Sequence, residues 1–276
     1  MQAPGWDSSL LRQIAIASNE SGKVQSTMEP IQTAVESLVS AILRFIGSDK
    51  LANGELGVEY TYASLPLCVI DAVFSIGVRY EGTTRPTVLR FCASRGWEPY
   101  SELRREGYHS IAEFIGILNG LSDQALAEQV FNNRQRTSSR NGILKAKAVK
   151  LFADALLRAG INNFTDLEDE EKCAVAERIV QGIAGQKSGI SFKYFRMLAG
   201  DDDHVKGDRQ IISFVSNALG RQVSSQEAET LVKAASRVLR IRHQRLVPRL
   251  LDYLIWDYMR SGGGHPVVSS PCAKST

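Results

Sequence analysis

The chain has 276 residues, of which 43% are hydrophobic and 23% are charged, and its formal net charge is +3. This is the composition of an ordinary globular protein with a sizeable core, and the charge is too small to indicate a polyanionic partner by itself. The N-terminus has no basic stretch followed by an apolar one, and the longest apolar run, residues 63–78, contains Asp71 and is too short to span a bilayer. We therefore expect a cytoplasmic protein without a membrane segment.

The spacing of the four cysteines argues against a cofactor. Cys68, Cys92, Cys173 and Cys272 are widely scattered and form no CxxC pair. Neither a zinc site nor an iron–sulfur cluster is indicated by that spacing. We expect reduced thiols, no metal and no cofactor.

Hydrophobic positions recur with helical spacing along most of the chain, and no segment alternates with period two for long. In residues 30–46, Ile31, Val35, Leu38, Ile42 and Phe45 share one helical face. Further helices are expected over 64–80, 86–95, 110–118, 123–132, 142–160, 170–180, 190–198, after Asp208, after Ser224 and over 249–259. The pattern predicts an all-α fold of about ten helices.

Several residues mark where these helices begin. Pro66 and Pro248 stand in first turns, where a missing backbone N–H has no consequence. Ser122 is an expected N-cap, and the segments from Thr165 to Glu168 and from Ser224 to Glu227 have capping-box patterns.

Two windows carry positive charge and no acidic residue: residues 132–150 and residues 233–249. The first holds Arg134, Arg136, Arg140, Lys145, Lys147 and Lys150. Such windows are either solvated helix faces or surfaces that contact phosphates.

The segment LAGDDDHVKGDRQIISF, residues 198–214, poses the main question of function. Asp208 stands directly before an apolar-periodic stretch, so it is either a helix cap or a carboxylate placed for chemistry. Asp201–Asp203 are adjacent on one turn, and we expect them, like His204, to be solvated rather than to bind a metal.

Glycines precede this segment. The sequence GIAGQKSG, residues 182–189, separates the expected helices over 170–180 and 190–198. Glycine lets backbone N–H groups approach a phosphate closely, and the following helix adds the positive end of its dipole. An ordinary helical hairpin with a glycine C-cap is the alternative.

A glycine hairpin, an apolar helix and an aspartate that opens another helix together resemble the core of the helix-hairpin-helix DNA glycosylase superfamily, and of its endonuclease III and adenine glycosylase branches in particular. Residues 141–156 resemble another helix of that family, with Gly142, Lys147 and Ala148 in register, and residues 71–91 resemble its N-terminal helix. The resemblance covers about residues 64–256.

The resemblance implies two helical subdomains around a cleft in residues 64–260, preceded by a helical extension, residues 1–63. Residues 261–276 lack core-forming side chains and are expected to be a disordered tail. The implied activity is hydrolysis of the N-glycosidic bond of a modified or damaged base, with Asp208 as the catalytic carboxylate. The implied partner is double-stranded DNA, bound by a monomer.

Site residues follow from the same resemblance and from the charge windows. The expected DNA contacts are Gly182, Gly185, Gln186, Lys187, Ser188, Gly189, Arg140, Lys145 and Lys147. A base must leave the stack to be reached, and the aromatic side chains expected to receive it are Tyr80, Tyr62 and Tyr194, with Tyr60 and Trp97 as further candidates. Tyr253 and Trp256 are expected in the core.

The sequence departs from the family at three places. The lyase branch has a lysine just after the hairpin glycines, where this chain has Ser188 or Gly189, so we expect a monofunctional enzyme. Lys187 is one or two positions away and is the candidate nucleophile if the enzyme does have lyase activity. Gly77 stands where the family often has a base-wedging glutamine, and the cluster-binding cysteines are absent. Two alternatives to a repair enzyme remain open: a catalytically inactive DNA-binding protein of this fold, and a phage-defence glycosylase acting on modified phage bases.

Overall fold

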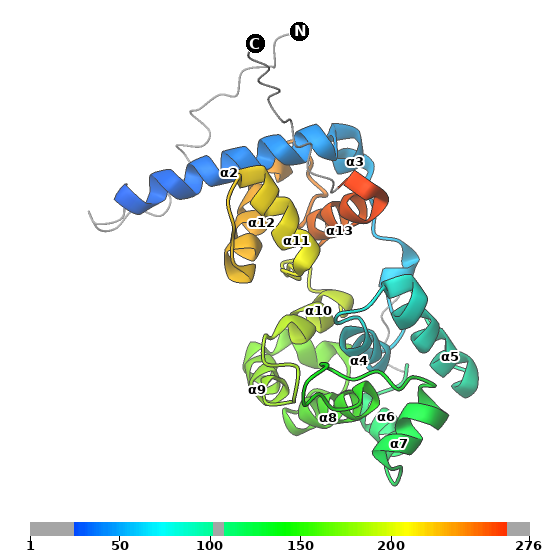
Figure 1. Cartoon of the computed structure of the whole chain (residues 1–276). Coiled ribbons are helices and arrows are strands. Elements are labelled where there is room, and N and C mark those ends of the chain that lie inside the picture. The colour runs from blue at the N-terminus through cyan, green and yellow to red at the C-terminus, as the bar shows by residue number, and fades with distance from the viewer. Residues whose placement is uncertain (1–24, 102–107, 264–276) are drawn as a thin grey trace, which may run out of the picture.

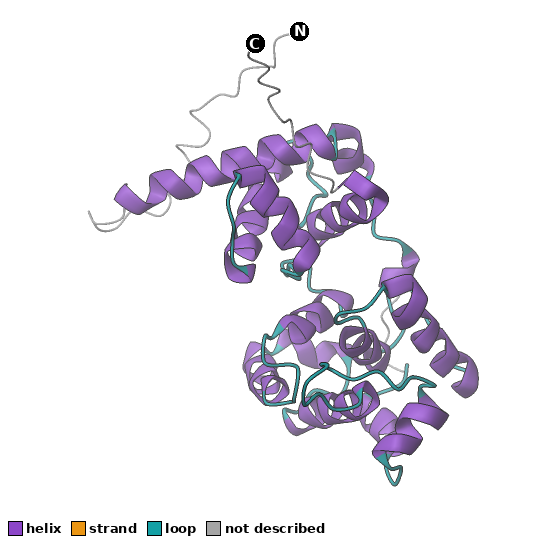
Figure 2. Ribbon diagram, in the orientation of Figure 1, coloured by secondary structure: helices purple, strands orange, loops and turns teal. Residues whose placement is uncertain are grey.

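All regular structure in the described residues is helical (Figure 2), which confirms the predicted all-α class. The computed structural model describes residues 25–101 and 108–263, and most of the predicted tail lies outside them. Its α-helices are α2 (Gln25–Phe45), α3 (Ser48–Asn53), α4 (Leu65–Phe74), α5 (Arg85–Arg95), α6 (Ile111–Leu118), α7 (Asp123–Ala125), α8 (Lys145–Arg158), α9 (Glu170–Gln181), α10 (Ile190–Leu198), α11 (Arg209–Leu219), α12 (Ser225–Arg240) and α13 (Pro248–Tyr258). Among them, no helix has the length and apolarity of a membrane span.

The helices form two lobes, each with its own hydrophobic core (Figure 1). The central lobe, residues 62–199, contains α4 to α10. The terminal lobe, residues 31–53 and 205–263, joins α2 and α3 to α11, α12 and α13. The chain therefore crosses between the lobes twice, first at residues 54–61 and again at residues 199–208, and α2 and α3 pack with the C-terminal helices.

Helix α4 is the centre of the central lobe, and all ten of its residues are buried. It packs against α10, α8, α5 and α6, so it needs apolar side chains all round rather than on one face. The predicted helix over 64–80 ends earlier, at Phe74. A turn containing Gly77, with φ +71°, breaks the expected helix over 71–91 into α4 and α5.

In the terminal lobe, α2 lies along α12 and α11. Val35, Leu38 and Ile42 are buried as predicted, because they face these helices. Ile31 and Phe45, placed on the same face, are 55% and 46% exposed. The ring of Phe45 nevertheless contacts those of Phe214 in α11 and Tyr258 in α13, so only part of this side chain is open to solvent.

The predicted helix starts are confirmed at two serines. Ser122 Oγ accepts from Ala125 N and Ser224 Oγ accepts from Glu227 N, each at 3.1 Å. The prediction for Thr165 was wrong: it lies within a 3₁₀ turn, Phe164–Glu168, and α9 begins after Asp169. Asp169 Oδ1 accepts from Glu171 N at 3.0 Å and from Lys172 N at 3.1 Å.

The second crossing between the lobes, residues 199–208, is held by a row of ion pairs. Asp201, Asp202 and Asp203 pair respectively with Arg196 of α10, Arg249 of α13 and Lys233 of α12, at 2.6, 3.6 and 3.3 Å. His204 Nδ1 also lies 2.9 Å from Asp201 Oδ2. Asp202 and Asp203 are exposed, as expected, whereas Asp201 and His204 are partly buried, and each acid also pairs with a different helix.

Arg249 connects both crossings. Its guanidinium donates from Nη2 to the backbone oxygen of Tyr60 at 2.9 Å, in the first crossing, and approaches Asp202 in the second. The Arg249 backbone N–H also donates to the backbone oxygen of Asp202 at 3.0 Å. The Arg249 side chain is only 7% exposed, so its bond to the Tyr60 oxygen is little weakened by solvent, whereas its contact with Asp202, which is 58% exposed, is partly screened.

We predict that Arg249→Met lowers the free energy of unfolding by about 2–3 kcal/mol, because a buried carbonyl and a carboxylate lose a charged donor. The matched control is Arg245→Met, four residues away. Arg245 pairs with Glu55 on the surface, with both side chains more than half exposed, so its loss should change stability by less than about 1 kcal/mol. Urea unfolding of both variants measures the difference, and equal stabilities would contradict the role given to Arg249.

Candidate functional site

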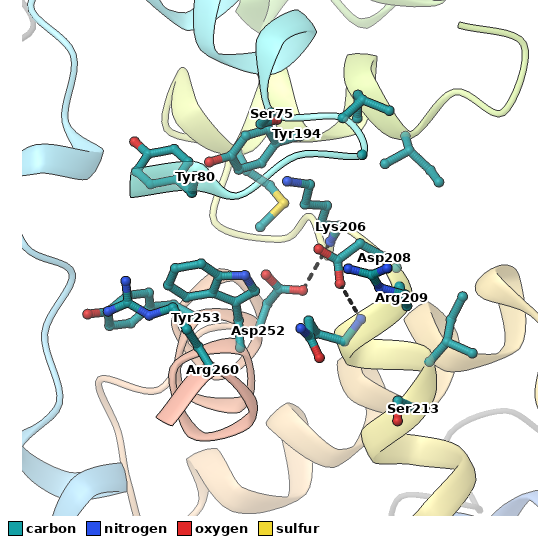
Figure 3. Close-up of a pocket in the computed structure, with 18 of the residues that line it drawn as sticks. Ser75, Tyr80, Tyr194, Lys206, Asp208, Arg209, Ser213, Asp252, Tyr253 and Arg260 are labelled. Atoms are coloured by element: carbon teal, nitrogen blue, oxygen red, sulfur yellow. Dashed lines mark hydrogen bonds between the residues drawn. The ribbon is translucent and has the colours of Figure 1, made fainter. Parts of the chain in front are cut away.

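A cavity of about 980 Å³ lies between the two lobes. Its central-lobe wall consists of α10 and residues 75–81, and its terminal-lobe wall consists of α13 and the start of α11 (Figure 3). The first crossing contributes Tyr60, and the second contributes Lys206 and Gly207. The volume is at the upper end of the usual range for small-molecule sites.

Asp208 lies in the wall of this cavity and is also the N-cap of α11. Its Oδ1 accepts from Gln210 N at 2.8 Å and from Ile211 N at 3.3 Å. Both bonds use the same oxygen, so capping does not occupy Oδ2. The two interpretations of this aspartate, cap and cavity carboxylate, are compatible in one conformation.

A second carboxyl group, Asp252 of α13, was missed in the sequence. It is 6% exposed, lines the cavity, and its Oδ1 accepts from Lys206 N at 3.1 Å. Burial, followed by the neighbouring charge of Asp208, raises the pKa of Asp252 from 3.8 to about 7. The signal for it was an acidic residue within the apolar run from Leu250 to Ile255, where a carboxyl group must be buried.

A third carboxyl group, Asp71, lies behind the central-lobe wall. Its Oδ2 accepts from the Tyr62 hydroxyl at 2.6 Å and from the Tyr80 hydroxyl at 3.0 Å. Burial raises the pKa of Asp71 to about 6, although the hydrogen bond from Tyr62 and the charge of Lys206 oppose that rise. Tyr62 is itself completely buried and does not line the cavity, so its expected contact with a base was wrong.

Aromatic rings from both lobes form one side of the cavity. Tyr60 stacks on Tyr80 at 6.4 Å and contacts Tyr253 at 5.0 Å, and Trp256 meets Tyr80 edge-on at 6.4 Å. The structure thus brings the predicted Tyr80 and Tyr60 together, and it corrects the assignment of Tyr253 and Trp256 to the core. Tyr194 also lines the cavity, as predicted.

Trp97 is not part of this site. It is buried in the central lobe, and its ring stacks on His109 at a centroid distance of 3.6 Å. As a candidate for base contact it was wrong, because its neighbours fill the central core instead of facing the cavity.

Positive charge predominates in the cavity wall. Its lining includes Arg79, Lys206, Arg209, Arg249 and Arg260, against Glu81, Asp208 and Asp252. The Lys206 ammonium lies 3.5 Å from the ring centroid of Tyr194, a cation–π contact (Figure 3). This distribution suits a ligand that carries negative charge around a less polar centre.

The predicted glycine hairpin is present between α9 and α10, and it packs against the first basic window. At Gly185, with φ +86°, an added Cβ would lie 2.5 Å from Cβ of Thr137. Ile190, which follows the hairpin, lines the cavity, so the hairpin ends at the cavity's edge.

The hairpin residues differ in their access to solvent. Gly182, Gly185, Lys187 and Ser188 are exposed, whereas Gln186 and Gly189 are buried and so are unsuited to the expected DNA contacts. The amides of Gly182, Ile183, Gln186 and Gly189 already donate to backbone oxygens, in Ile179, Val180, Ile183 and Gln186 respectively. Amide contact with a phosphate is thus left to the exposed part of the turn, where Gly185, Lys187 and Ser188 lie.

In the basic window, the three predicted contact residues have different environments. Arg140 is exposed, and Lys147 is partly exposed with its Nζ 2.7 Å from Asp123. Lys145 is 1% exposed, and its Nζ donates to the backbone oxygens of Phe74 at 2.9 Å and Ile76 at 2.7 Å. Burial lowers the pKa of Lys145 to about 8. The expectation that Lys145 contacts DNA was wrong, because it satisfies the carbonyls at the end of α4 instead.

The raised pKa of Asp252 predicts how stability depends on pH. Between 3.8 and about 7, the folded state keeps a proton that the unfolded state has released, so wild-type stability falls as pH rises through this range. Asp252→Asn removes this dependence while keeping an acceptor for Lys206 N. We expect the stability of the variant relative to wild type to increase by roughly 2–3 kcal/mol between about pH 5 and pH 8.

Urea unfolding of both proteins at the two pH values measures this change. The ionisation of Asp71 affects the stability of wild type and of Asp252→Asn alike, so its contribution cancels when the two stabilities are subtracted. A difference that does not vary with pH would show that Asp252 is ionised normally.

No curated protein and no solved structure matches the chain significantly. One protein family does match, over residues 36–260, and its description is a domain of unknown function, DUF8548. The matched range begins within α2 and ends just after α13, so it includes both lobes and every wall of the cavity. The chain therefore belongs to the DUF8548 family.

Proposed function

We propose that the protein is a DNA N-glycosylase that receives an extruded base in the cavity between the lobes and hydrolyses its N-glycosidic bond with Asp208. The observation that carries this proposal is the place of Asp208. It opens the helix that follows the hairpin helix α10, and it lies in the cavity wall between the two lobes.

The chemistry of the site supports this function. Breaking the glycosidic bond leaves positive charge on the sugar, and a carboxylate held against the sugar stabilises that charge. Capping holds Asp208 rigidly through Oδ1, which leaves Oδ2 for the sugar or for the attacking water. Tyr60, Tyr80 and Trp256 offer ring faces and edges on which an unstacked base can pack.

The arrangement of the hairpin supports DNA as the partner. Lys187 and Ser188 are exposed on the turn, and the turn packs against the loop that carries Arg140. Contacts of this kind hold the phosphate backbone without reading its sequence. Repair and phage defence share this chemistry and differ only in the base that is removed.

We predict that Asp208→Asn abolishes base release and leaves DNA binding and stability unchanged, because asparagine caps a helix about as well as aspartate does. The matched control is Asp169→Asn. Asp169 caps α9 through the same pair of backbone bonds but is exposed and outside the cavity. It should retain full activity, whereas Asp208→Asn should lose at least about 100-fold.

The measurement is single-turnover base release from duplexes that each carry one modified or mismatched base, together with binding to the same duplexes. Undiminished activity in Asp208→Asn would refute the catalytic role. DNA binding without base release by wild type would favour the alternative of an inactive DNA-binding protein.

We further predict that the enzyme lacks lyase activity. Lys187 is exposed on the hairpin and is not part of the cavity wall. Lys206 is in the cavity wall, but its ammonium is held against the Tyr194 ring, 3.5 Å from the ring centroid.

Borohydride reduction in the presence of a duplex with an abasic site should therefore trap no covalent complex. If a complex is trapped, the variants Lys187→Ala and Lys206→Ala show which lysine forms it. Trapping that disappears only in Lys187→Ala would restore the nucleophile expected from the sequence, and trapping that disappears only in Lys206→Ala would identify a different one.

A further inference from the structure

The two carboxyl groups of the cavity lie near each other but in different surroundings. Figure 3 shows Asp208 and Asp252 on the terminal-lobe side, below Lys206 and Tyr194. They come from α11 and α13, which pack against each other, so their separation is set by the core of that lobe. Asp252 is 6% exposed, whereas Asp208 is at a helix end.

The surroundings of Asp208 stabilise its negative charge. It accepts two backbone N–H groups and lies at the positive end of the α11 dipole. It is also part of the cavity wall, so a carboxylate in this position is suited to stabilising a cationic sugar.

The surroundings of Asp252 oppose a negative charge. Burial is the largest effect, and the like charges of Asp208 and of Glu229 on α12 add to it. The Lys206 amide and ammonium oppose these effects, and Glu229 is partly neutralised by Lys193 at 2.5 Å. The result is a pKa of about 7 for Asp252, so a large part of the protein carries a proton on it at neutral pH. Tyr194 and Arg249 are its other charged or titratable neighbours from α10 and α13.

Two carboxyl groups in one cavity, one buried and the other at a helix start, suit a division of roles in which one serves as the acid and the other as the charge stabiliser. We propose that Asp252 donates the proton that the departing base requires, while the Asp208 carboxylate stabilises the sugar. The proposal rests on the proposed glycosylase function and adds a class of substrate to it. That class is neutral bases, which leave as anions unless they are protonated; a base already made cationic by alkylation needs no acid.

The steps balance without any further reactant. The bond between C1′ and the base nitrogen breaks, its electron pair goes to the base, and the proton of Asp252 goes to a nitrogen or oxygen of the base. Water then adds to C1′ and gives its proton to the Asp252 carboxylate. The products are the neutral base and an abasic site, and both carboxyl groups return to their starting states.

The decisive variant is Asp252→Asn, because asparagine keeps the oxygen that accepts from Lys206 N but has no acidic proton. Asp49→Asn makes the same chemical change on the exposed first turn of α3, far from the cavity lining, and is the control. The probes are duplexes with uracil, hypoxanthine, 8-oxoguanine, or adenine opposite 8-oxoguanine as neutral bases, and a duplex with 7-methylguanine as a cationic one. Single-turnover base release is followed between about pH 5 and pH 9.

For each neutral base that wild type releases, we expect the rate to fall as pH rises through about 7. Asp252→Asn should lower the rate about 100-fold at low pH and remove the fall at higher pH. Asp49→Asn should match wild type throughout. Release of a neutral base by Asp252→Asn with the wild-type rate and pH profile would overturn the proposal, and so would release of 7-methylguanine alone.

A second measurement does not depend on base release. The side-chain carboxyl carbons of aspartate are labelled with ¹³C, Asp252 is assigned from its missing signal in Asp252→Asn, and its chemical shift is followed against pH. We expect a pKa of about 7 that falls in Asp208→Asn, since a like charge has been removed. An ordinary value for Asp252 would overturn this inference and leave the glycosylase proposal intact. Absence of base release from every duplex would overturn the glycosylase proposal and this inference with it, whatever the titration shows.

Discussion

The return of the chain from α10 to α11 depends on three ion pairs in a row. Asp201, Asp202 and Asp203 are consecutive, yet they pair with Arg196, Arg249 and Lys233 on three different helices. Adjacent residues in an irregular segment point in different directions, so one short acidic run is able to hold three elements at once. Five residues later the same segment delivers Asp208 to the cavity wall, so the position of that carboxylate relative to both lobes depends on these pairs.

The cavity is a product of the way the two lobes are connected. Since residues 31–53 and 205–263 share the terminal lobe, both crossings lie on the border between the lobes, and Arg249 contacts both of them. The cavity lining comes from each lobe and from each crossing. A small change in the angle between the lobes would move Tyr80 away from Trp256 and Lys206 away from Tyr194. The contacts of Arg249 with the two crossings therefore fix the relative position of the lobes as well as stabilise the fold.

Buried carboxyl groups destabilise a fold, and here two of them are retained close to one cavity. The Oδ2 of Asp71 accepts from the hydroxyl groups of Tyr62 and Tyr80, and the Oδ1 of Asp252 accepts from the Lys206 amide. Replacing either by an apolar residue would suit the core better, which makes a purely structural role a poor explanation for both. The charge of Lys206 near each of them connects the two lobes electrostatically.

Local rules in the sequence determined the helices and where they start. Ser122, Ser224 and Pro248 identify helix starts correctly because capping involves only neighbouring residues, and Asp208 was recognised as a cap for the same reason. Tertiary structure alone decided which faces of those helices meet. From the sequence, Lys145 is expected to be a solvent-exposed cation. Only the tertiary structure shows that its ammonium donates to the backbone oxygens at the end of α4. Likewise Asp252, Tyr253 and Trp256 lie on a helix whose apolar pattern suits a core, and only the gap left between two separately packed lobes makes them the wall of a cavity.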